Sequence, residues 1–283
     1  MKMEIIEERV TTILRPTGIN LAPYVINPYQ GCELGCVFCY AQFNKAALKS
    51  GRRWGSYVKV KINAAQVLEE ELEIKKPDKV LLGSTTECFQ PAERKYRITE
   101  NILRVLNRHR IKYVILSRSL LTGNYLPLLK EGFCEAVYFT VDILPDRMKR
   151  KLELKVPVYS QSLKMINKLA RGGINAIAYF CPVMPWFFDA AFERIKKAGG
   201  AEKAEFEIMN FKMANTGMII KSIKKLYPGL TARYEKLLRD KDFYEGEMDE
   251  LKKDIVETGA KHFKLIKIHS HPYQGYFGNL YGT

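Results

Sequence analysis

The sequence predicts an α/β fold, a partial (β/α)6 barrel followed by a helical C-terminal extension. Short runs of continuous apolar residues recur along the 283-residue chain, as expected of strands that are buried on both faces. Amphipathic stretches with helical periodicity separate these runs, and the whole pattern repeats roughly every thirty residues. After Asn215 the apolar runs give way to consecutive helical patterns. The strands of such a fold are parallel, and their carboxyl ends gather the chemistry at one edge of the sheet.

The elements follow in order along the chain. Residues 1–23 are expected to be irregular, with a short strand at 11–14, because Pro16 and Pro23 break any helix. Six strands are predicted at 24–27, 79–83, 113–116, 136–141, 176–181 and 205–209. Helices are predicted at 41–49, 63–74, from 99 onward, at 124–130, 160–171 and 187–197. Asn63, Thr99 and Ser160 are the predicted N-caps, and Pro77 and Gly172 follow helix ends.

The last part of the chain has a different pattern. Three helices are predicted at 216–226, 231–240 and 245–258, followed by a last strand at 262–268. We therefore divide the chain into a barrel domain, residues 1–215, and a helical extension, residues 216–283, which is expected to cap the mouth of the barrel.

The charge is strongly positive. Lys and Arg number 46 against 31 Asp and Glu, which gives a formal net charge of +15. Such a balance favours a polyanionic partner, although a generally basic surface has the same composition. No apolar run approaches the ~18 residues that span a bilayer, and the N-terminal residues are too charged for a signal peptide. We expect a cytoplasmic protein without membrane association.

The most informative residues are three closely spaced cysteines. Cys32, Cys36 and Cys39 form a CX3CX2C pattern that is followed by an aromatic residue, Tyr40. Three thiolates so close together can bind three irons of a [4Fe–4S] cluster and leave the fourth iron open. A zinc site would need a second ligand pair, which the sequence lacks. The remaining cysteines, Cys88, Cys134 and Cys181, are too scattered for a disulfide framework.

The motif resembles that of the radical S-adenosylmethionine (SAM) superfamily. Residues 27–41 are similar to its spore photoproduct lyase-like branch, and residues 86–93 resemble that branch's T-D-P-Y-Q-P-x-E motif. The resemblance implies a TIM-type partial barrel in which SAM chelates the open iron of a [4Fe–4S] cluster. It also implies reductive cleavage of SAM to a 5′-deoxyadenosyl radical, with flavodoxin or ferredoxin as the electron donor.

The resemblance also implies positions that contact SAM. Each lies at the carboxyl end of a predicted strand, where a structural turn or cap is the alternative role. The implied cofactor-binding residues are Tyr40, Gly83, Ser84, Thr85, Ser117, Arg118, Thr140, Asp142, Pro182, Met184 and Asn210.

Cys88 is a candidate catalytic residue. Glu87 and Cys88 replace Asp and Pro of the branch motif. A thiol near the barrel mouth can return a hydrogen atom to a product radical, as a cysteine does in spore photoproduct lyase. A free buried cysteine is the alternative.

Other segments carry weaker signals. The loop 50–56 is interpreted as a solvated basic turn, with substrate contact as the alternative. The basic segments 147–151 and 221–225 are interpreted either as a surface that follows phosphates or as ordinary exposed helix faces. His109, His269 and His271 are expected to be structural or surface groups.

The sequence thus predicts a radical SAM enzyme, with nucleic acid as a candidate substrate. A radical SAM enzyme acting on a small molecule or peptide is the first alternative. A non-catalytic, metal-stabilised nucleic-acid-binding protein is the second.

Overall fold

The computed structural model describes residues 3–153, 155–188, 194–195 and 201–275. Its main sheet has the strand order β11-β10-β9-β8-β7-β6-β3-β2. The strands are β2 (Arg15–Pro16), β3 (Tyr24–Ile26), β6 (Lys79–Leu82), β7 (Lys112–Ser117), β8 (Cys134–Val141), β9 (Ala176–Val183), β10 (Lys203–Ile208) and β11 (Leu265–His269). All neighbouring pairs are parallel except β2 with β3. The edge strands β2 and β11 do not pair with each other, so the barrel is partial.

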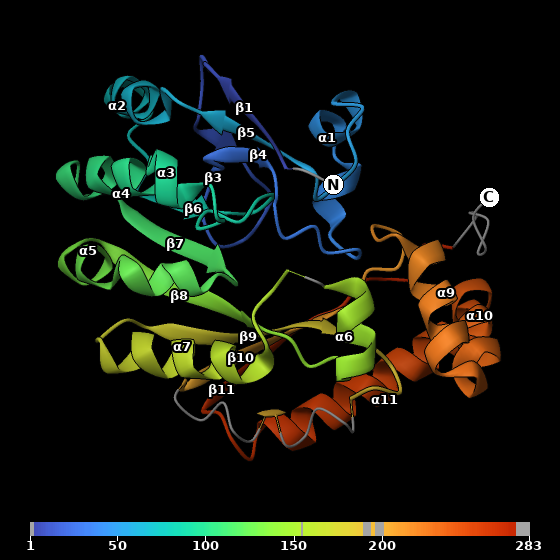
Figure 1. The fold of residues 1–283 in the computed structure, drawn as a ribbon. Coiled ribbons are helices and arrows are strands. Elements are labelled where there is room, and N and C mark those ends of the chain that lie inside the picture. The colour runs from blue at the N-terminus through green and yellow to red at the C-terminus, as the bar shows by residue number, and fades with distance from the viewer. Residues whose placement is uncertain (1–2, 154, 189–193, 196–200, 276–283) are drawn as a thin grey trace.

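Helices cover the outer face of this sheet (Figure 1). They are α2 (Ala64–Lys75), α3 (Glu93–Tyr96), α4 (Ile98–Arg108), α5 (Leu126–Glu131) and α7 (Tyr159–Arg171). Helix α4 contacts β7, and α7 contacts β8 and β9. The strand residues that face these helices form the large core, which includes fully buried Val80, Ile115 and Phe180.

The inner face of the sheet has its own small core. Val25, Leu81, Val114 and Ile177 point inward from four strands and pack against the lead-in segment at Ala22. This apolar plug fills the amino-terminal end of the barrel. Polar side chains on the same inner face therefore lie nearer the carboxyl ends of the strands.

A second, smaller sheet lies beside the barrel. It joins β1 (Glu4–Glu8), β5 (Tyr57–Lys61) and β4 (Tyr29–Gly31) in the order β1-β5-β4. Two short helical segments, η1 (Tyr40–Phe43) and α1 (Lys45–Lys49), connect β4 to β5. The sequence did not predict this sheet, because its strands are very short or alternate with exposed residues.

Four further helical elements lie at the carboxyl edge or beyond it. They are η2 (Leu120–Asn124), α6 (Asp146–Leu152), α9 (Thr216–Leu226) and α10 (Thr231–Arg239), and η4 (Pro228–Leu230) links the last two. The long helix α11 (Lys241–Gly259) then leads into β11. In Figure 1 α6, α9 and α10 lie beyond the arrowheads of the strands. Within the described residues, no helix is long and apolar enough to cross a lipid bilayer.

The comparison with the predicted elements is mixed. All six predicted barrel strands are confirmed, and so are the three C-terminal helices and a last strand. The short strand at 11–14 is wrong, since β2 begins only at Arg15. Residues 189–193 and 196–197 of the predicted helix 187–197 lie outside the described residues.

The predicted helix caps need correction as well. Asn63 occupies the N-cap position of α2, but its side chain instead bonds to both backbone groups of Val10 at 2.8 Å. Thr99 lies inside α4, and the N-terminal amides of that helix donate to the Glu93 carboxylate at 3.0 Å. Helix α7 begins before Ser160. At α2 a residue distant in sequence, Val10, occupies the side chain of the predicted cap, and at α4 the capping carboxylate comes from Glu93 of the preceding short helix.

Candidate functional site

The cysteine loop connects β4 to η1 at the carboxyl edge of the barrel. Cys32 and Cys36 are buried, and Cys39 is half-buried. Gly31 turns the chain into the loop with a φ of +82°, and a Cβ there would lie 2.5 Å from the carbonyl oxygen of Tyr57. Only glycine fits this position. Burial raises the pKa of each of the three thiols to about 12.

The loop 50–56 packs against the cysteine loop. Gly35 (φ +60°) and Gly55 (φ +83°) approach so closely that a Cβ on either would lie 2.8 Å from the Cα of the other. Trp54 packs against the apolar cluster that contains Cys32 and Cys36. The loop is therefore a wall of the site and not a freely solvated turn.

The second sequence motif braces the cysteine loop. Thr86 donates its hydroxyl to the carbonyl of Gly31 at 2.6 Å. Gln90 accepts the amide of Glu33 at 2.9 Å, and the Glu33 carboxylate accepts the amide of Ala92 at 2.6 Å. Reciprocal bonds of this kind fix two loops relative to each other, which explains why both motifs occur together.

Three predicted residues at the end of β6 lie beside the cysteine loop. Tyr40, which is 43% exposed, donates its hydroxyl to the carbonyl of Ser84 at 2.5 Å. Asn27 bonds the Ser84 hydroxyl at 3.3 Å and the Thr85 amide at 3.0 Å. Gly83 adopts a φ of +87°, and a Cβ there would lie 2.7 Å from the carbonyl of Leu116.

Arg118 links the cysteine loop to a buried group of charges. Its Nη1 donates to the Cys36 sulfur at 3.5 Å and to the Glu153 carboxylate. Lys149 bonds to Asp142 at 2.5 Å and lies 3.8 Å from Glu153. Burial raises the pKa of the Glu153 carboxyl, and the neighbouring charge of Asp142 adds to the effect. Asp142 is thus occupied by an internal ion pair, and it also accepts the Leu144 amide at 2.8 Å.

Several predicted positions have internal partners or are buried. The Ser117 hydroxyl donates to Glu87 at 2.8 Å, and Glu87 also accepts the Arg118 amide at 2.8 Å. Cys88 is fully buried in the main core, next to Gly83. The structure therefore gives its thiol a packing position, not an exposed one.

The remaining predicted positions lie farther along the edge. Thr140 is half-buried near the end of β8, and Pro182 and Met184 are buried at the end of β9. The Asn210 side chain accepts the amides of Lys212 and Met213 at 3.2 Å and so shapes the turn after β10.

The sequence did not predict a polar layer on β9–β11. Tyr179 donates to Glu207 at 2.7 Å, and His271 lies 2.7 Å from the other oxygen of that carboxylate. Two residues earlier on β10, and so farther from the carboxyl edge, Glu205 lies 2.6 Å from His269. The signal was present: Glu205 and Glu207 alternate with the core residues Phe206 and Ile208, which places both on the inner face.

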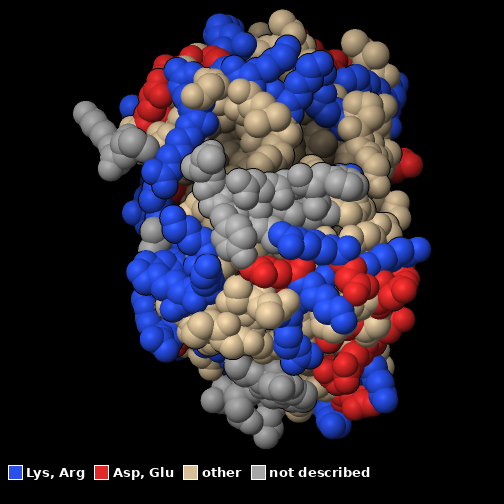
Figure 2. Space-filling model, turned by 90° about the vertical axis from the view of Figure 1, so that its right-hand side faces the viewer, with Lys and Arg blue, Asp and Glu red and all other residues tan. Residues whose placement is uncertain are grey.

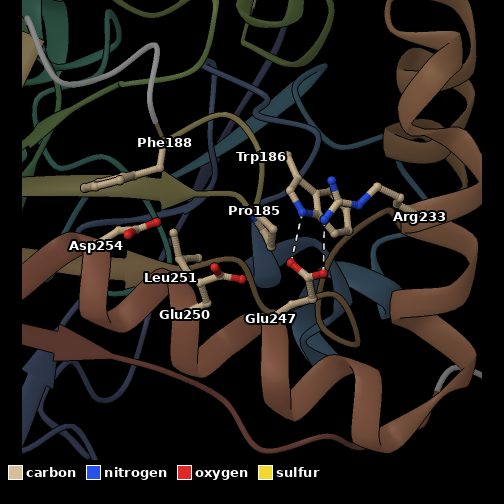
Figure 3. Close-up of a pocket in the computed structure, with 8 residues that line it drawn as sticks. All are labelled: Pro185, Trp186, Phe188, Arg233, Glu247, Glu250, Leu251 and Asp254. Carbon is tan, nitrogen blue, oxygen red and sulfur yellow. Dashed lines mark hydrogen bonds and ion pairs between the residues drawn. The ribbon is translucent and has the colours of Figure 1, made fainter.

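A separate cavity of 210 Å³ lies between the segment that follows β9 and helix α11. Figure 3 shows Trp186 and Arg233 beside each other, both directed at Glu247, and the indole donates to Glu247 at 2.9 Å. Arg233 lies over the Trp186 ring at 4.5 Å and bonds Glu247 at 3.1 Å. No cysteine lines this cavity, so it is distinct from the site around the cysteine loop.

A comparison with protein families decides the family. The model of the radical SAM superfamily matches residues 26–198, which is more than half of the chain. The chain belongs to the radical SAM superfamily. The matched residues include the cysteine loop and the strands β6, β7, β8 and β9.

Relatives and solved structures agree with this assignment. An uncharacterized protein of Methanocaldococcus jannaschii is 29% identical over 75% of this chain and 80% of its own. Spore photoproduct lyase complexed with dinucleoside spore photoproduct has a TM-score of 0.65, with 14% identity over 93% of this chain and 81% of its own. SuiB of Streptococcus suis bound to the precursor peptide SuiA has a TM-score of 0.54, with 16% identity over 87% and 48%. At such identities the structural matches establish the fold.

The residues of the loop fit the iron–sulfur cluster that the superfamily implies. Among the described residues, no three His, Cys, Asp or Glu side chains are arranged to hold a metal ion. In a cluster each cysteine binds a different iron. The sulfur atoms of the three cysteines therefore lie farther apart than the ligand atoms around a single metal ion. The buried Trp54 Nε1, which packs with these cysteines, has no hydrogen-bond partner. The sulfur atoms of a bound cluster could accept a hydrogen bond from this indole N–H, which would satisfy the buried donor.

Proposed function

We propose that Cys32, Cys36 and Cys39 hold a [4Fe–4S] cluster and that SAM binds at its open iron. The observation that supports this most is that three cysteines, two buried and one half-buried, lie beside Tyr40, Ser84 and Arg118 at one edge of a parallel sheet. When bound, the cluster supplies the electron that cleaves SAM to methionine and a 5′-deoxyadenosyl radical, which abstracts hydrogen from the substrate. A flavodoxin or ferredoxin is the proposed source of that electron.

The chain supplies placement, charge and exclusion of water. Arg118 is the only cation described in contact with a loop cysteine, so its guanidinium is the proposed partner of the SAM carboxylate. Ser84 and Thr85, held by Asn27, offer oxygens to the SAM amine. Gly83 leaves room for a close approach.

The other predicted cofactor residues support this shell. Thr140 lies on the inner face and is the proposed neighbour of the SAM ribose. Ser117 bonds Glu87, whose carboxylate also accepts the backbone amide of Arg118. Asp142 pairs with Lys149, which lies close to Glu153, the partner of the Arg118 guanidinium. Both residues are therefore proposed to position Arg118. Pro182 and Met184, buried at the end of β9, and the turn at Asn210 are the proposed boundary of the site on its far side.

Nucleic acid is the proposed substrate class. The net charge of +15 and the fold shared with spore photoproduct lyase favour it. The fold shared with SuiB, which was solved with a peptide, supports a peptide as the second candidate. In either case the polar layer of Tyr179, Glu207 and His271 is the proposed wall against which the substrate rests.

The cofactor proposal is tested by anaerobic reconstitution. We expect a brown protein with about four irons per chain whose electron paramagnetic resonance signal, after reduction, changes when SAM is added. Cys36→Ala should lose the cluster, whereas Cys134→Ala, on a strand distant from the loop, should keep it. A colourless protein that binds zinc would overturn the proposal.

The substrate proposal needs a coupling assay. Enzyme, dithionite and SAM are mixed separately with single-stranded DNA, RNA, a peptide library and a metabolite extract. We expect 5′-deoxyadenosine formation to rise several-fold with one nucleic acid alone. An increase only with peptides would favour the second candidate and refute the first.

A further inference from the structure

Basic side chains from four segments of the chain lie at the carboxyl edge of the barrel. We define this basic band by Arg53, Arg147, Arg150, Lys155, Lys221 and Lys225, all of which are exposed. Arg53 belongs to the loop before β5, the next two residues to α6, Lys155 to the segment after α6, and the last two to α9. These segments are more than a hundred residues apart in sequence at their extremes, so only the fold brings them together.

Specific contacts make the band continuous with the cysteine loop. Helix α6 packs against α9. The amide of Val37, inside the cysteine loop, donates to the carbonyl of Leu152 at the end of α6 at 2.9 Å. The Lys155 ammonium donates to the carbonyl of Gly55 at 3.2 Å, which joins the segment after α6 to the loop that holds Arg53. The band therefore borders the proposed cofactor site directly.

The segments of the band are almost free of acidic residues. No Asp or Glu occurs in residues 34–68 or in residues 208–234. On α6 the exposed acid is Asp146, which pairs with Arg194 at 2.7 Å. Elsewhere on the molecule Lys and Arg alternate with Glu, as in α11. An ordinary solvated surface would show that alternation here as well, so the local excess of cations is a property of this face.

Figure 2 shows this face of the molecule. Lys and Arg side chains gather along its upper and left edges, with a smaller group of Asp and Glu at the upper left. A hollow opens between uncharged side chains near the top, and most Asp and Glu gather at the lower right. Such a separation of charge orients a polyanion along the basic side and holds it away from the acidic side. Two exposed aromatic side chains, Tyr40 and Phe43, adjoin the cysteine loop on η1, where a base can stack.

We propose that the basic band binds the sugar–phosphate backbone of a nucleic acid strand and leads it to the barrel mouth. This inference rests on the proposed function, since it places the substrate of the same site. Chemistry on a base requires that the base leave its stack and enter the site. A band outside the mouth with aromatic residues at its rim provides for both steps: the phosphates stay on the cations, and one nucleotide turns inward.

The test measures binding of fluorescein-labelled single-stranded DNA by the full-length protein over a series of NaCl concentrations. Four charges are reversed together: Arg147→Glu, Arg150→Glu, Lys221→Glu and Lys225→Glu. We expect at least a tenfold loss of affinity at about 0.1 M salt, and a slope of log K against log salt that is flatter by about 3, because each lost phosphate contact removes roughly 0.7. Each helix pair alone should give an intermediate loss.

A matched control reverses Lys253→Glu and Lys261→Glu. Lys253 lies in the second half of α11 and Lys261 in the turn between α11 and β11, and both side chains are exposed. This turn lies at the edge of the sheet opposite the mouth, because it leads into the start of β11. We expect the affinity of this variant to stay within about twofold of the parent. Equal losses in the control and in the matched α6 pair would overturn the proposal, because they would show an effect of net charge alone.

Two further arms separate this inference from the proposed function. Cys36→Ala should bind the oligonucleotide normally although it forms no 5′-deoxyadenosine, so a failure of the radical chemistry leaves the binding test valid. Vesicles that contain phosphatidylserine are the second probe. Vesicle binding that depends on the same four residues, with no binding of DNA or RNA, would overturn the proposal in favour of a membrane surface.

Discussion

The contact between the cysteine loop and the loop 50–56 depends on two glycines. Gly35 lies 2.8 Å, measured from a hypothetical Cβ, from the Cα of Gly55, which is backbone that cannot move aside like a side chain. We predict that Gly35→Ala separates the two loops and lowers the iron content after reconstitution to less than half of the parent value. Iron and sulfide analysis of anaerobically reconstituted protein measures this.

Gly51 provides a control for that prediction. It has a similar φ of +63°, but a Cβ there meets nothing within 4 Å. Gly51→Ala therefore carries only the cost of the left-handed backbone, about 1 kcal/mol, without the contact. Equal iron losses in the two variants would show that backbone strain, and not the contact between the loops, decides cluster binding.

The buried charges around Arg118 are expected to contribute to the free energy of unfolding. The Glu153 side chain is fully buried, and Arg118 and Lys149 are its described cationic neighbours. Removal of one member of a buried pair leaves a charge without compensation, which costs about 3–5 kcal/mol. We predict that Arg118→Met lowers the free energy of unfolding in urea by about 3 kcal/mol, and that adding Glu153→Gln restores at least half of it. A double variant that is no more stable than Arg118→Met would contradict the pairing.

At this scale the spacing of the cysteines was easier to recognise than the partners of the other predicted residues. The spacing of Cys32, Cys36 and Cys39 is a local pattern, so it could be recognised without a fold. The roles of Ser117 and Asp142 depend on Glu87 and Lys149, which lie on other elements. No local pattern reveals such partners, and the same holds for the full burial of Cys88.

The lead-in segment is fixed to the barrel by one side chain of helix α2. The Glu71 carboxylate accepts the amides of Ile13 and Leu14 at 2.8 and 2.7 Å, and it also binds Thr12 and Lys75. Burial alone would raise the pKa of Glu71, but these hydrogen bonds outweigh it and lower the pKa to about 2. Glu71 thus holds the segment that precedes the apolar plug of the barrel.

This arrangement predicts a pH-dependent loss of stability. A carboxyl whose pKa is lower in the folded state stabilises the fold above its unfolded pKa of about 4.3, and this contribution disappears as the pH falls toward 2. We predict that Glu71→Gln costs about 2 kcal/mol at pH 7 and much less at pH 2.5. Urea unfolding at both pH values measures the difference. Glu70→Gln, on the exposed side of the same helix, should be neutral throughout.

The elements themselves were largely predictable, whereas their ends were not. Continuous apolar runs identified β6, β7, β8 and β9, because strands buried on both faces leave that pattern in the sequence. The start of α4 was misplaced, since the cap comes from Glu93 and not from Thr99. The polar layer at Glu205 and Glu207 was missed because β10 was interpreted as a uniformly buried strand, although its residues alternate.

In the molecule as a whole, the basic band and the carboxyl ends of the parallel strands lie at the same edge of the sheet. A parallel sheet places all its strand ends, and hence the cysteine loop and the polar layer, at its carboxyl edge. The basic band, on α6, α9 and the loops that hold Arg53 and Lys155, lies at the same edge. Figure 2 shows Lys and Arg gathered on this face. The net charge was visible in the sequence, but its concentration was not, because contacts between α6 and α9 exist only in the fold.

The division of the chain into a barrel and a C-terminal extension remains a prediction that the packing makes testable. Strand β11 pairs with β10 along its whole length, and Phe263 contacts Phe180 of β9 at 5.9 Å between ring centroids. Gly259 also packs against Phe206. A chain that ends at residue 215 would expose this apolar surface, so we predict that it lacks a cooperative thermal transition by circular dichroism.

A single substitution measures how much one contact between the extension and the barrel contributes to stability. Phe263→Ala removes one buried ring from the seam between the extension and the barrel, and we expect a loss of about 3 kcal/mol in the free energy of unfolding. Because native proteins are stable by only about 5–15 kcal/mol, losing the whole seam would exceed that margin. If residues 1–215 instead unfold cooperatively within about 5 °C of the full chain, the extension is an independent domain and Phe263→Ala should be almost neutral. The two measurements together therefore decide whether the last strand belongs to the barrel in stability as it does in hydrogen bonding.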